Sequence, residues 1–265
     1  MPAAGVARIG SVRVNLRSRG QVLDRFRAAL AGGPPLAVAS ANLDHLHHFA
    51  RRDPPLPAGA FDGMDWLTLL DGRPLGRAVQ HALGPDAAEL HPGSALLPEV
   101  LDLAAAQGSR VVLIGGDDGL RRAWSSVLAT DYPGLRDAGT RRVDWSWLDR
   151  PGSGHDLARW VAEREADVVV ICLGKPRQEV WMRDHGRASR ARLLLAFGSA
   201  AEYVAGTTRR PPRWARQHGL EWAVRLVREP RRLWRRYLLD GPRALLLLRH
   251  ATFADNSPTK PGHLP

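Results

Sequence analysis

Five short apolar runs, each followed by a longer segment of helical periodicity, constrain the fold of this chain most strongly. The hydrophobicity of each run is continuous, which indicates strands that are buried on both faces. Strands that alternate with helices predict an α/β fold, with a Rossmann-like, mostly parallel sheet flanked by helices. The predicted strands lie in the runs 36–40, 66–72, 110–116, 167–174 and 191–198.

The pattern changes after Gly206, where a Pro/Arg linker, TTRRPPRW, leads into two helical segments separated by Pro230. Each segment carries an apolar stripe with arginines beside it, so a basic helical appendage is expected at this end. The expected organisation is a Rossmann-like core over 1–206, an Arg-rich amphipathic appendage over 207–250 and a disordered tail over 251–265.

Charge is concentrated in the same region. The formal net charge of the chain is +11, and residues 206–250 hold twelve arginines and three acids, which places +9 of that charge there. A basic end of this kind suggests a phosphate-bearing partner, which could be a nucleic acid, an anionic lipid or a nucleotide.

Cysteine content and hydropathy indicate the compartment. Cys172 is the single cysteine, which excludes a disulfide framework and favours a protein that faces the cytosol. No stretch approaches the roughly 20 apolar residues of a spanning helix, and the first ten residues do not resemble a signal peptide. We therefore expect a cytoplasmic protein that is able to lie on a membrane surface.

The residues directly after the apolar runs are the candidates for chemistry, because ligands bind outside the carboxyl ends of the strands in such sheets. Four of the five ends carry glycine, which lets a ligand approach the backbone closely. The candidates are Ser40, Asn42, Asp71, Gly72, Gly115, Gly116, Gly174, Lys175, Gln178 and the stretch 198–202, which includes Glu202.

Several of these positions also have an ordinary structural interpretation. The sequence IGGDDG matches neither the GxGxxG fingerprint nor a P-loop, which weighs against NAD and ATP. Asp71 and Gly72 form a common turn pair, and Gln178 and Glu179 suit the first turn of any helix. Three histidines crowd residues 45–48, but without a second ligand cluster we expect no metal site and no cofactor.

Taken together, these pieces resemble the TagA/WecG/CpsF family of bacterial glycosyltransferases from about residue 9 to residue 249. The C-terminal matching stretch, residues 205–237, is long and distinctive. The most specific stretches are SANLDHLHHFARRD (40–53), LLDG with RPLG (69–76), LGKPRQEVW (173–181) and AGTTRRPPRWARQHGLEWAVRLVREPRRLWRRY (205–237).

The resemblance implies an inverting, metal-independent transfer of an N-acetylmannosamine-type or glucose-type sugar. The donor would be a UDP-sugar, and the acceptor a polyprenyl-diphosphate-linked saccharide in cell-surface polysaccharide or teichoic-acid-type synthesis. Such an enzyme works peripherally on the inner face of the cell membrane. The family also suggests a homo-oligomer, and nucleic acid is not among its partners.

The resemblance also assigns roles to residues. The family's catalytic aspartate falls on Asp71, a general base that takes the proton from the acceptor hydroxyl. Ser40 stands where the family has a threonine near the acceptor. Gln178 matches a family glutamine that helps hold the sugar or phosphate. Glu202 matches a nucleotide-contacting position at which the family more often has Asp.

A diphosphate leaving group needs cationic stabilisation, and the chain has no Asp-x-Asp motif for a metal. In the family, arginines of the appendage fold over the active site to supply it. They fall here on Arg225, Arg232 and Arg235, and arginine suits the task through planar, bidentate phosphate contacts.

Two departures from the family pattern fall within ELHPGSALL. Leu90 stands where the family has an arginine and Ala95 where it has an aspartate, which favours a changed donor sugar. The same departures sustain an alternative, a non-catalytic partner in a polysaccharide assembly complex. A basic nucleic-acid-binding protein is the other alternative, and it leaves Asp71 and Gln178 without a purpose.

Overall fold

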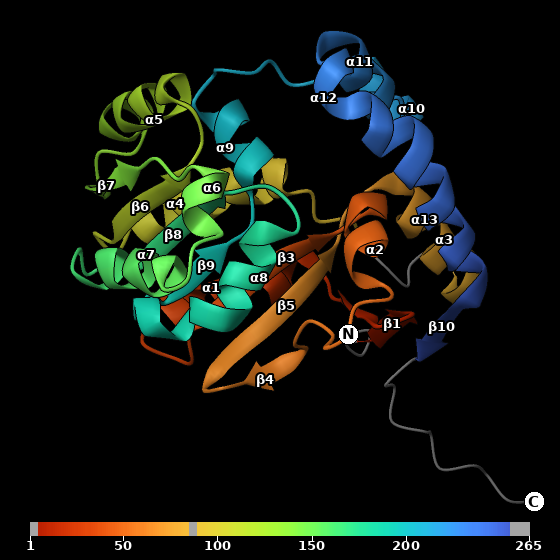
Figure 1. Cartoon of the computed structure of the whole chain (residues 1–265), viewed down its shortest axis with the longest axis horizontal. Coiled ribbons are helices and arrows are strands. Elements are labelled where there is room, and N and C mark those ends of the chain that lie inside the picture. The colour runs from red at the N-terminus through yellow and green to blue at the C-terminus, as the bar shows by residue number, and fades with distance from the viewer. Residues whose placement is uncertain (1–4, 85–88, 255–265) are drawn as a thin grey trace, which may run out of the picture.

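The five predicted strands all form, and they lie parallel to one another within a single sheet. The chain is described by a computed structural model that covers residues 5–84 and 89–254. The parallel strands and the helices around them confirm the α/β prediction (Figure 1). The carboxyl ends of the five strands lie at the same edge of the sheet. The strands are β3 (Leu36–Ala41), β5 (Met64–Leu70), β6 (Arg110–Gly115), β8 (Val168–Cys172) and β9 (Leu193–Leu195).

Further strands, which the apolar runs did not indicate, bring the sheet of the described residues to ten strands. Strands β10, β1 and β2 extend it on one side and β7 on the other, in the order β10-β1-β2-β5-β3-β9-β8-β6-β7, with β4 beside β5. β7 is parallel to β6, and its residues are exposed or half-buried, which explains the lack of an apolar run. The added strands are β1 (Gly5–Ile9), β2 (Val12–Leu16), β4 (Gly59–Phe61), β7 (Arg136–Arg141) and β10 (Ala251–Ala254).

Strand β10 corrects the expected start of the tail. Residues 251–254 pair antiparallel with β1, in a register that sets Ala251 opposite Ile9. The hairpin partner β2 covers only one side of β1, so the other side presents backbone hydrogen-bonding groups that a further strand can satisfy. The expected tail over 255–265 lies outside the described residues.

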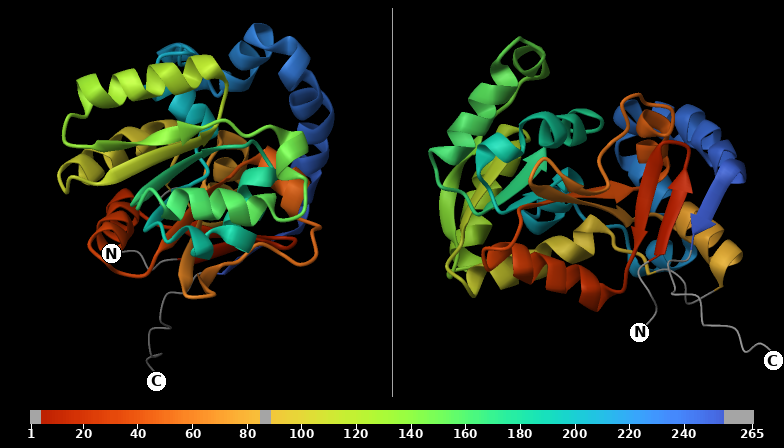
Figure 2. Two further views of the ribbon diagram at one scale, coloured as in Figure 1. Left: turned by 60° about the vertical axis from the view of Figure 1, so that its left-hand side comes forward. Right: turned by 90° about the horizontal axis from the view of Figure 1, so that it is seen from below.

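Helices cover both faces of the sheet (Figure 2). One face packs against α1 (Arg19–Leu30), α4 (Gly93–Ala105), α5 (Asp118–Asp131) and α9 (Gly198–Val204) in a single apolar cluster. The other face packs against α7 (Ser153–Ala162) and α8 (Arg177–His185), with the short helix α6 (Trp145–Leu148) at its margin. A third cluster joins β1 and β2 to α2 (Leu43–Phe49) and α3 (Arg73–Leu83).

The basic appendage forms a series of short helices that lies against α2 and α3 (Figure 1). Its buried apolar side chains in the described residues are those of Ala215, Leu233 and Ala244, and Ala244 belongs to the cluster of β1 and β2. The appendage is therefore packed on the core and ends in its edge strand β10. It contains α10 (Arg213–His218), α11 (Glu221–Arg228), α12 (Pro230–Trp234), a π-helical turn (Arg235–Asp240), α13 (Gly241–Leu247) and a 3-10 turn (Leu248–His250).

Candidate active site

Asp71 lies directly after β5, at the carboxyl edge of the sheet. β3 and β5 are paired in register, with Ser40 opposite Leu69 and Ala41 opposite Leu70, so their ends are level. The Asp71 amide extends this ladder by donating a 2.8 Å hydrogen bond to the Ala41 carbonyl. The sheet therefore fixes the backbone from which the carboxylate projects.

The Asp71 carboxylate is held by Asn42. The Nδ2 of Asn42 donates to Oδ2 of Asp71 at 3.5 Å, and the Oδ1 of Asn42 accepts from the His45 amide at 3.1 Å. The Asn42 side chain thus caps helix α2 and contacts the carboxylate at the same time. Gly72 follows with φ of 90°, a conformation that favours glycine.

The surroundings of Asp71 raise its pKa above the ordinary value, because the partial burial of the side chain disfavours its charged form. The charge of Lys175 and the hydrogen bond from Asn42 act in the opposite direction, and Arg236 of the appendage adds to them, whereas Glu221 raises the pKa further. A carboxylate with a raised pKa accepts a proton more readily near neutral pH, as a general base must.

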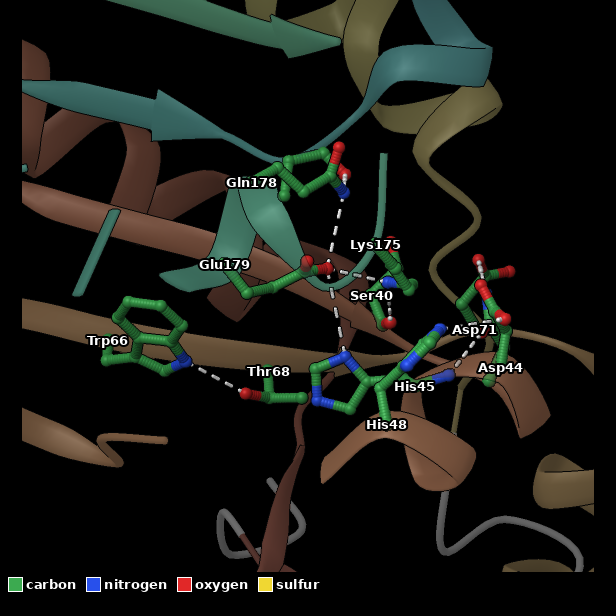
Figure 3. A network of polar contacts seen from close by, with 12 residues as sticks. Ser40, Asp44, His45, His48, Trp66, Thr68, Asp71, Lys175, Gln178 and Glu179 are labelled. Atoms are coloured by element: carbon green, nitrogen blue, oxygen red, sulfur yellow. Dashed lines mark hydrogen bonds and ion pairs between the residues drawn. The ribbon is translucent and has the colours of Figure 1, made fainter. Parts of the chain in front are cut away.

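Beside Asp71 lies a buried polar network centred on Glu179, which is 0% exposed (Figure 3). Its Oε1 accepts hydrogen bonds from Lys175 Nζ at 2.8 Å and from Gln178 Nε2 at 3.2 Å. His45 Nδ1 lies 3.9 Å from the same oxygen. Lys175 Nζ also donates to the Ser40 carbonyl at 3.0 Å, and Gln178 Nε2 to the Ala196 carbonyl at 3.2 Å.

The charges of the network follow from this packing. Burial alone would raise the pKa of Glu179, but Lys175 and His45 outweigh it and lower the pKa to about 2. Burial lowers the pKa of His45. Glu179 is therefore a carboxylate and His45 neutral near pH 7. The sequence pattern did not identify Glu179 as the centre of the site; the lysine four residues before it is the signal, since i and i+4 share a helix face.

The lowered pKa of Glu179 predicts a loss of stability in acid. The folded-state pKa of about 2 lies below the ordinary value of 4.5, so the stabilisation is complete above pH 4.5 and is lost as the pH falls toward 2. We expect the urea midpoint to fall between pH 5 and pH 3, and the Glu179→Gln variant to show a smaller fall over that window. An equal fall in both proteins would contradict the assignment.

The strand-end glycines have separate physical reasons. Gly115 and Gly116 have φ of 86° and 71°, and a Cβ on either would meet Cys172 O at 2.5 Å or Leu120 Cδ2 at 2.6 Å. Both are therefore needed to pack the turn from β6 into α5. Gly174 has φ of 75°, but among the described residues nothing lies within 4 Å of its Cβ position, so its backbone is open to a ligand.

One predicted arginine of the appendage lies beside Glu202. Burial would lower the pKa of Arg225, but Tyr237, Tyr203 and Glu202 outweigh it and raise it. The Nε of Arg225 is buried without a hydrogen-bond partner among the described residues. This places a half-buried guanidinium near the carboxyl end of β9, on the same edge of the sheet as Asp71.

Of the other two predicted arginines, only Arg235 has a described side chain, and it is exposed to solvent. Arg235 is exposed and lies over its neighbour Trp234, with 6.0 Å between the guanidinium and the ring centroid. The side chain of Arg232 lies outside the described residues. Arg236, which the sequence pattern did not single out, makes an ion pair of 3.4 Å with Asp44 of α2 and acts on Asp71.

Leu90 lines the margin of the site with an apolar side chain. A Cβ added at Gly76 of α3 would lie 2.8 Å from Leu90 Cδ2, so the leucine packs directly on the helix that follows Asp71. The backbone carbonyl of Ala95 accepts a 3.0 Å hydrogen bond from Arg19. The wall beside Asp71 is therefore hydrophobic at position 90.

The described residues contain neither a candidate metal cluster nor a helix that could span a membrane. No group of three or more His, Cys, Asp or Glu side chains in them could hold a metal ion. His47 instead lies 3.8 Å from Asp240, and His48 lies 3.7 Å from Asp44. No helix within 5–84 and 89–254 has the length and apolar character needed to cross a membrane.

The fold and the site define an α/β protein with a candidate catalytic carboxylate at the carboxyl edge of its sheet, below a basic appendage. The model of the glycosyl transferase WecG/TagA/CpsF family matches residues 7–257, and the chain belongs to this family.

One curated relative matches part of the chain. The N-acetylglucosaminyldiphosphoundecaprenol N-acetyl-beta-D-mannosaminyltransferase of Bacillus subtilis (strain 168) is 27% identical over 157 residues. The aligned stretch spans 59% of this chain and 59% of that protein. The name of the relative describes a sugar transfer to an acceptor that carries a polyprenyl diphosphate.

Proposed function

We propose that this protein transfers a sugar from a UDP-sugar to a polyprenyl-diphosphate-linked saccharide in cell-surface polysaccharide or teichoic-acid-type synthesis. The observation that carries the proposal is the Asp71 carboxylate, which the β3–β5 ladder and Asn42 hold at the edge of the sheet where ligands of such folds bind. Membership of the glycosyltransferase family and the name of the Bacillus subtilis relative support it.

In the proposed reaction, Asp71 removes the proton of the acceptor hydroxyl as its oxygen attacks the anomeric carbon of the donor. The bond from that carbon to the UDP oxygen breaks at the same time, and UDP departs with the electron pair. A single displacement of this kind inverts the anomeric centre. Ser40 is placed near the acceptor, and Gln178, whose amide is fixed by Ala196 and Glu179, near the sugar or phosphate.

The diphosphate of the leaving group requires positive charge, and we assign this to the appendage without a metal ion. Arg225 is better placed than Arg235, because its side chain is half-buried and within electrostatic reach of Glu202. Arg232 and Arg235 complete the proposed set. Asn42, Gly72, Gly115, Gly116, Gly174 and Glu202 form the proposed substrate-binding wall. Lys175, whose ammonium contacts Glu179 and Ser40, supports this wall from within the protein.

The appendage is also the proposed membrane contact, with residues 1–206 as the catalytic core. Many large apolar side chains of the appendage are at least 40% exposed, and exposed arginines stand among them. Basic residues near anionic lipid each contribute about 1 kcal/mol, and apolar side chains can insert at the interface. Peripheral attachment at the inner face of the membrane would bring the site to its lipid-linked acceptor, and self-association remains part of the proposal.

The donor is proposed to be an N-acetylmannosamine-type or glucose-type UDP-sugar. The relative is named for the first type, whereas the apolar Leu90 at the wall favours a donor that makes no ionic contact there.

We expect a panel of UDP-sugars, offered with polyprenyl-diphosphate-linked N-acetylglucosamine, to show acceptor-dependent UDP release with one donor of these types. Release would be followed by a coupled UDP assay, with the acceptor omitted as the control. A panel that gives no release with any donor would favour the alternative, a non-catalytic partner in polysaccharide assembly.

A further inference from the structure

Lys175 occupies an unusual place for a lysine, since its side chain is only 9% exposed and its ammonium group is directed into the protein. The group donates to Glu179 Oε1 at 2.8 Å and to the backbone carbonyl of Ser40 at 3.0 Å. An ammonium that only bound a ligand phosphate would need neither contact. The contact with Ser40 joins the loop after β8 to the end of β3, and the contact with Glu179 joins the same loop to α8.

The end of β3 is also what holds the catalytic candidate. The residue after Ser40, Ala41, accepts the backbone hydrogen bond of Asp71, and the next residue, Asn42, contacts the Asp71 carboxylate. Lys175 therefore secures the segment that positions Asp71, and Figure 3 shows its side chain between Glu179 and the segment of Ser40.

The charge balance gives the ammonium a second effect. The site holds two carboxylates, the half-buried Asp71 and the fully buried Glu179, while burial keeps His45 neutral. Lys175 is the strongest cationic influence on both carboxylates, ahead of Arg236, which reaches Asp71 from the appendage. Without this cation, both carboxylates would lose their main charge compensation, and the uptake of a proton by Asp71 would become more favourable.

We propose that Lys175 is a positioning residue that keeps Asp71 ionised and in place, so that the general base is ready before the appendage or the donor contributes any charge. This inference rests on the proposed function and deepens it: the electrostatic support of the base comes from the core of the protein, and the support of the leaving group comes from the appendage.

The test compares the pH dependence of kcat/KM in wild type and Lys175→Met. The acid limb, where Asp71 becomes protonated, is expected to move to higher pH by about one unit or more, since a nearby opposite charge shifts a carboxylate by about 1–3 units. The loss of activity is then larger at acid pH than at alkaline pH. A higher KM for the donor with an unmoved acid limb would show a phosphate ligand instead and overturn the proposal.

The acid limb is expected to respond differently when Glu179, the partner of Lys175, is replaced. Glu179→Gln breaks the same ion pair but keeps the ammonium and its charge, which acts on Asp71, so the acid limb is expected not to rise. A purely structural ion pair would give the same result in both variants, and that outcome overturns the proposal. Arg177→Met is the matched control, because it removes a cation two residues further on, at the start of α8, whose partner is the exposed Asp149.

Loss of Lys175 alone leaves Glu179 buried without its cation, which can prevent folding. The double variant Lys175→Met/Glu179→Gln removes both charges and is expected to fold and still to raise the acid limb, because Asp71 has lost its cation.

A readout independent of turnover separates this inference from the proposed function. In protein labelled with carbon-13 at the aspartate carboxyl groups, the Asp71 resonance is identified by its loss in Asp71→Asn. Its titration midpoint is expected to rise in the double variant relative to wild type, even if no sugar donor is found. An unchanged midpoint would overturn the role of Lys175, whereas a raised midpoint without turnover would count only against the transferase proposal.

Discussion

Replacing Asp71 with asparagine is expected to lower kcat/KM for sugar transfer by about 10²–10⁴-fold, the usual contribution of a general base. Asparagine has nearly the same shape and can still contact Asn42, but its amide cannot take the proton of the acceptor hydroxyl. The binding of UDP should change little, because the diphosphate is proposed to contact arginine and not Asp71. Steady-state UDP release and calorimetric titration with UDP measure the two quantities.

Asp65→Asn provides the matched control for this substitution. Asp65 lies at the opposite end of the same strand, β5, and pairs with Arg25 of α1, far from the carboxyl edge. Its loss is expected to leave kcat/KM within about twofold, because Asp65 stands at the opposite end of the strand from the candidate site. A rate in Asp71→Asn equal to that of Asp65→Asn would remove the general-base assignment.

The position of Asp71 illustrates what the sequence predicts well. The buried parallel strands are continuous apolar runs, so their ends, and the residues that follow them, can be located from the sequence. The same reasoning could not find β7 or β10, because β7 is exposed or half-buried and β10 exists only through pairing with β1. A strand that depends on its partner carries little local signal.

The polar network was harder to predict for a different reason. Lys175 and Glu179 are only four residues apart in the sequence. Their contacts with Ser40 and His45, however, depend on β3 and α2, which lie more than 100 residues earlier in the chain. Similarly, helical periodicity cannot decide which appendage arginine faces the core. The π-helical turn over Arg235–Asp240 shifts the phase, and Arg236 meets Asp44 while Arg235 is exposed.

Substituting serine for Trp214, Val227 and Leu238 together is expected to weaken binding to anionic vesicles by about 100-fold, from about 1 kcal/mol for each half-inserted side chain. These side chains are 55%, 81% and 54% exposed, so their loss should leave the packing of the core intact. Sedimentation with phosphatidylglycerol vesicles measures the partition. Transfer to a membrane-embedded acceptor should fall with it, while transfer to a short-chain, water-soluble acceptor should not.

Substitution is a sharper test of membrane attachment than truncation, because deleting the appendage would also remove Ala244 from the core and β10 from the sheet. The matched control is Phe61→Ser, since Phe61 is 40% exposed in β4, on the opposite side of the molecule from α11 (Figure 1). This control removes apolar surface of the same kind outside the appendage and should leave vesicle binding unchanged. An equal loss of vesicle binding in the triple variant and in Phe61→Ser would mean that any exposed apolar side chain supports membrane attachment. Unchanged binding of the triple variant would leave charge alone as the attraction, which added salt would then abolish.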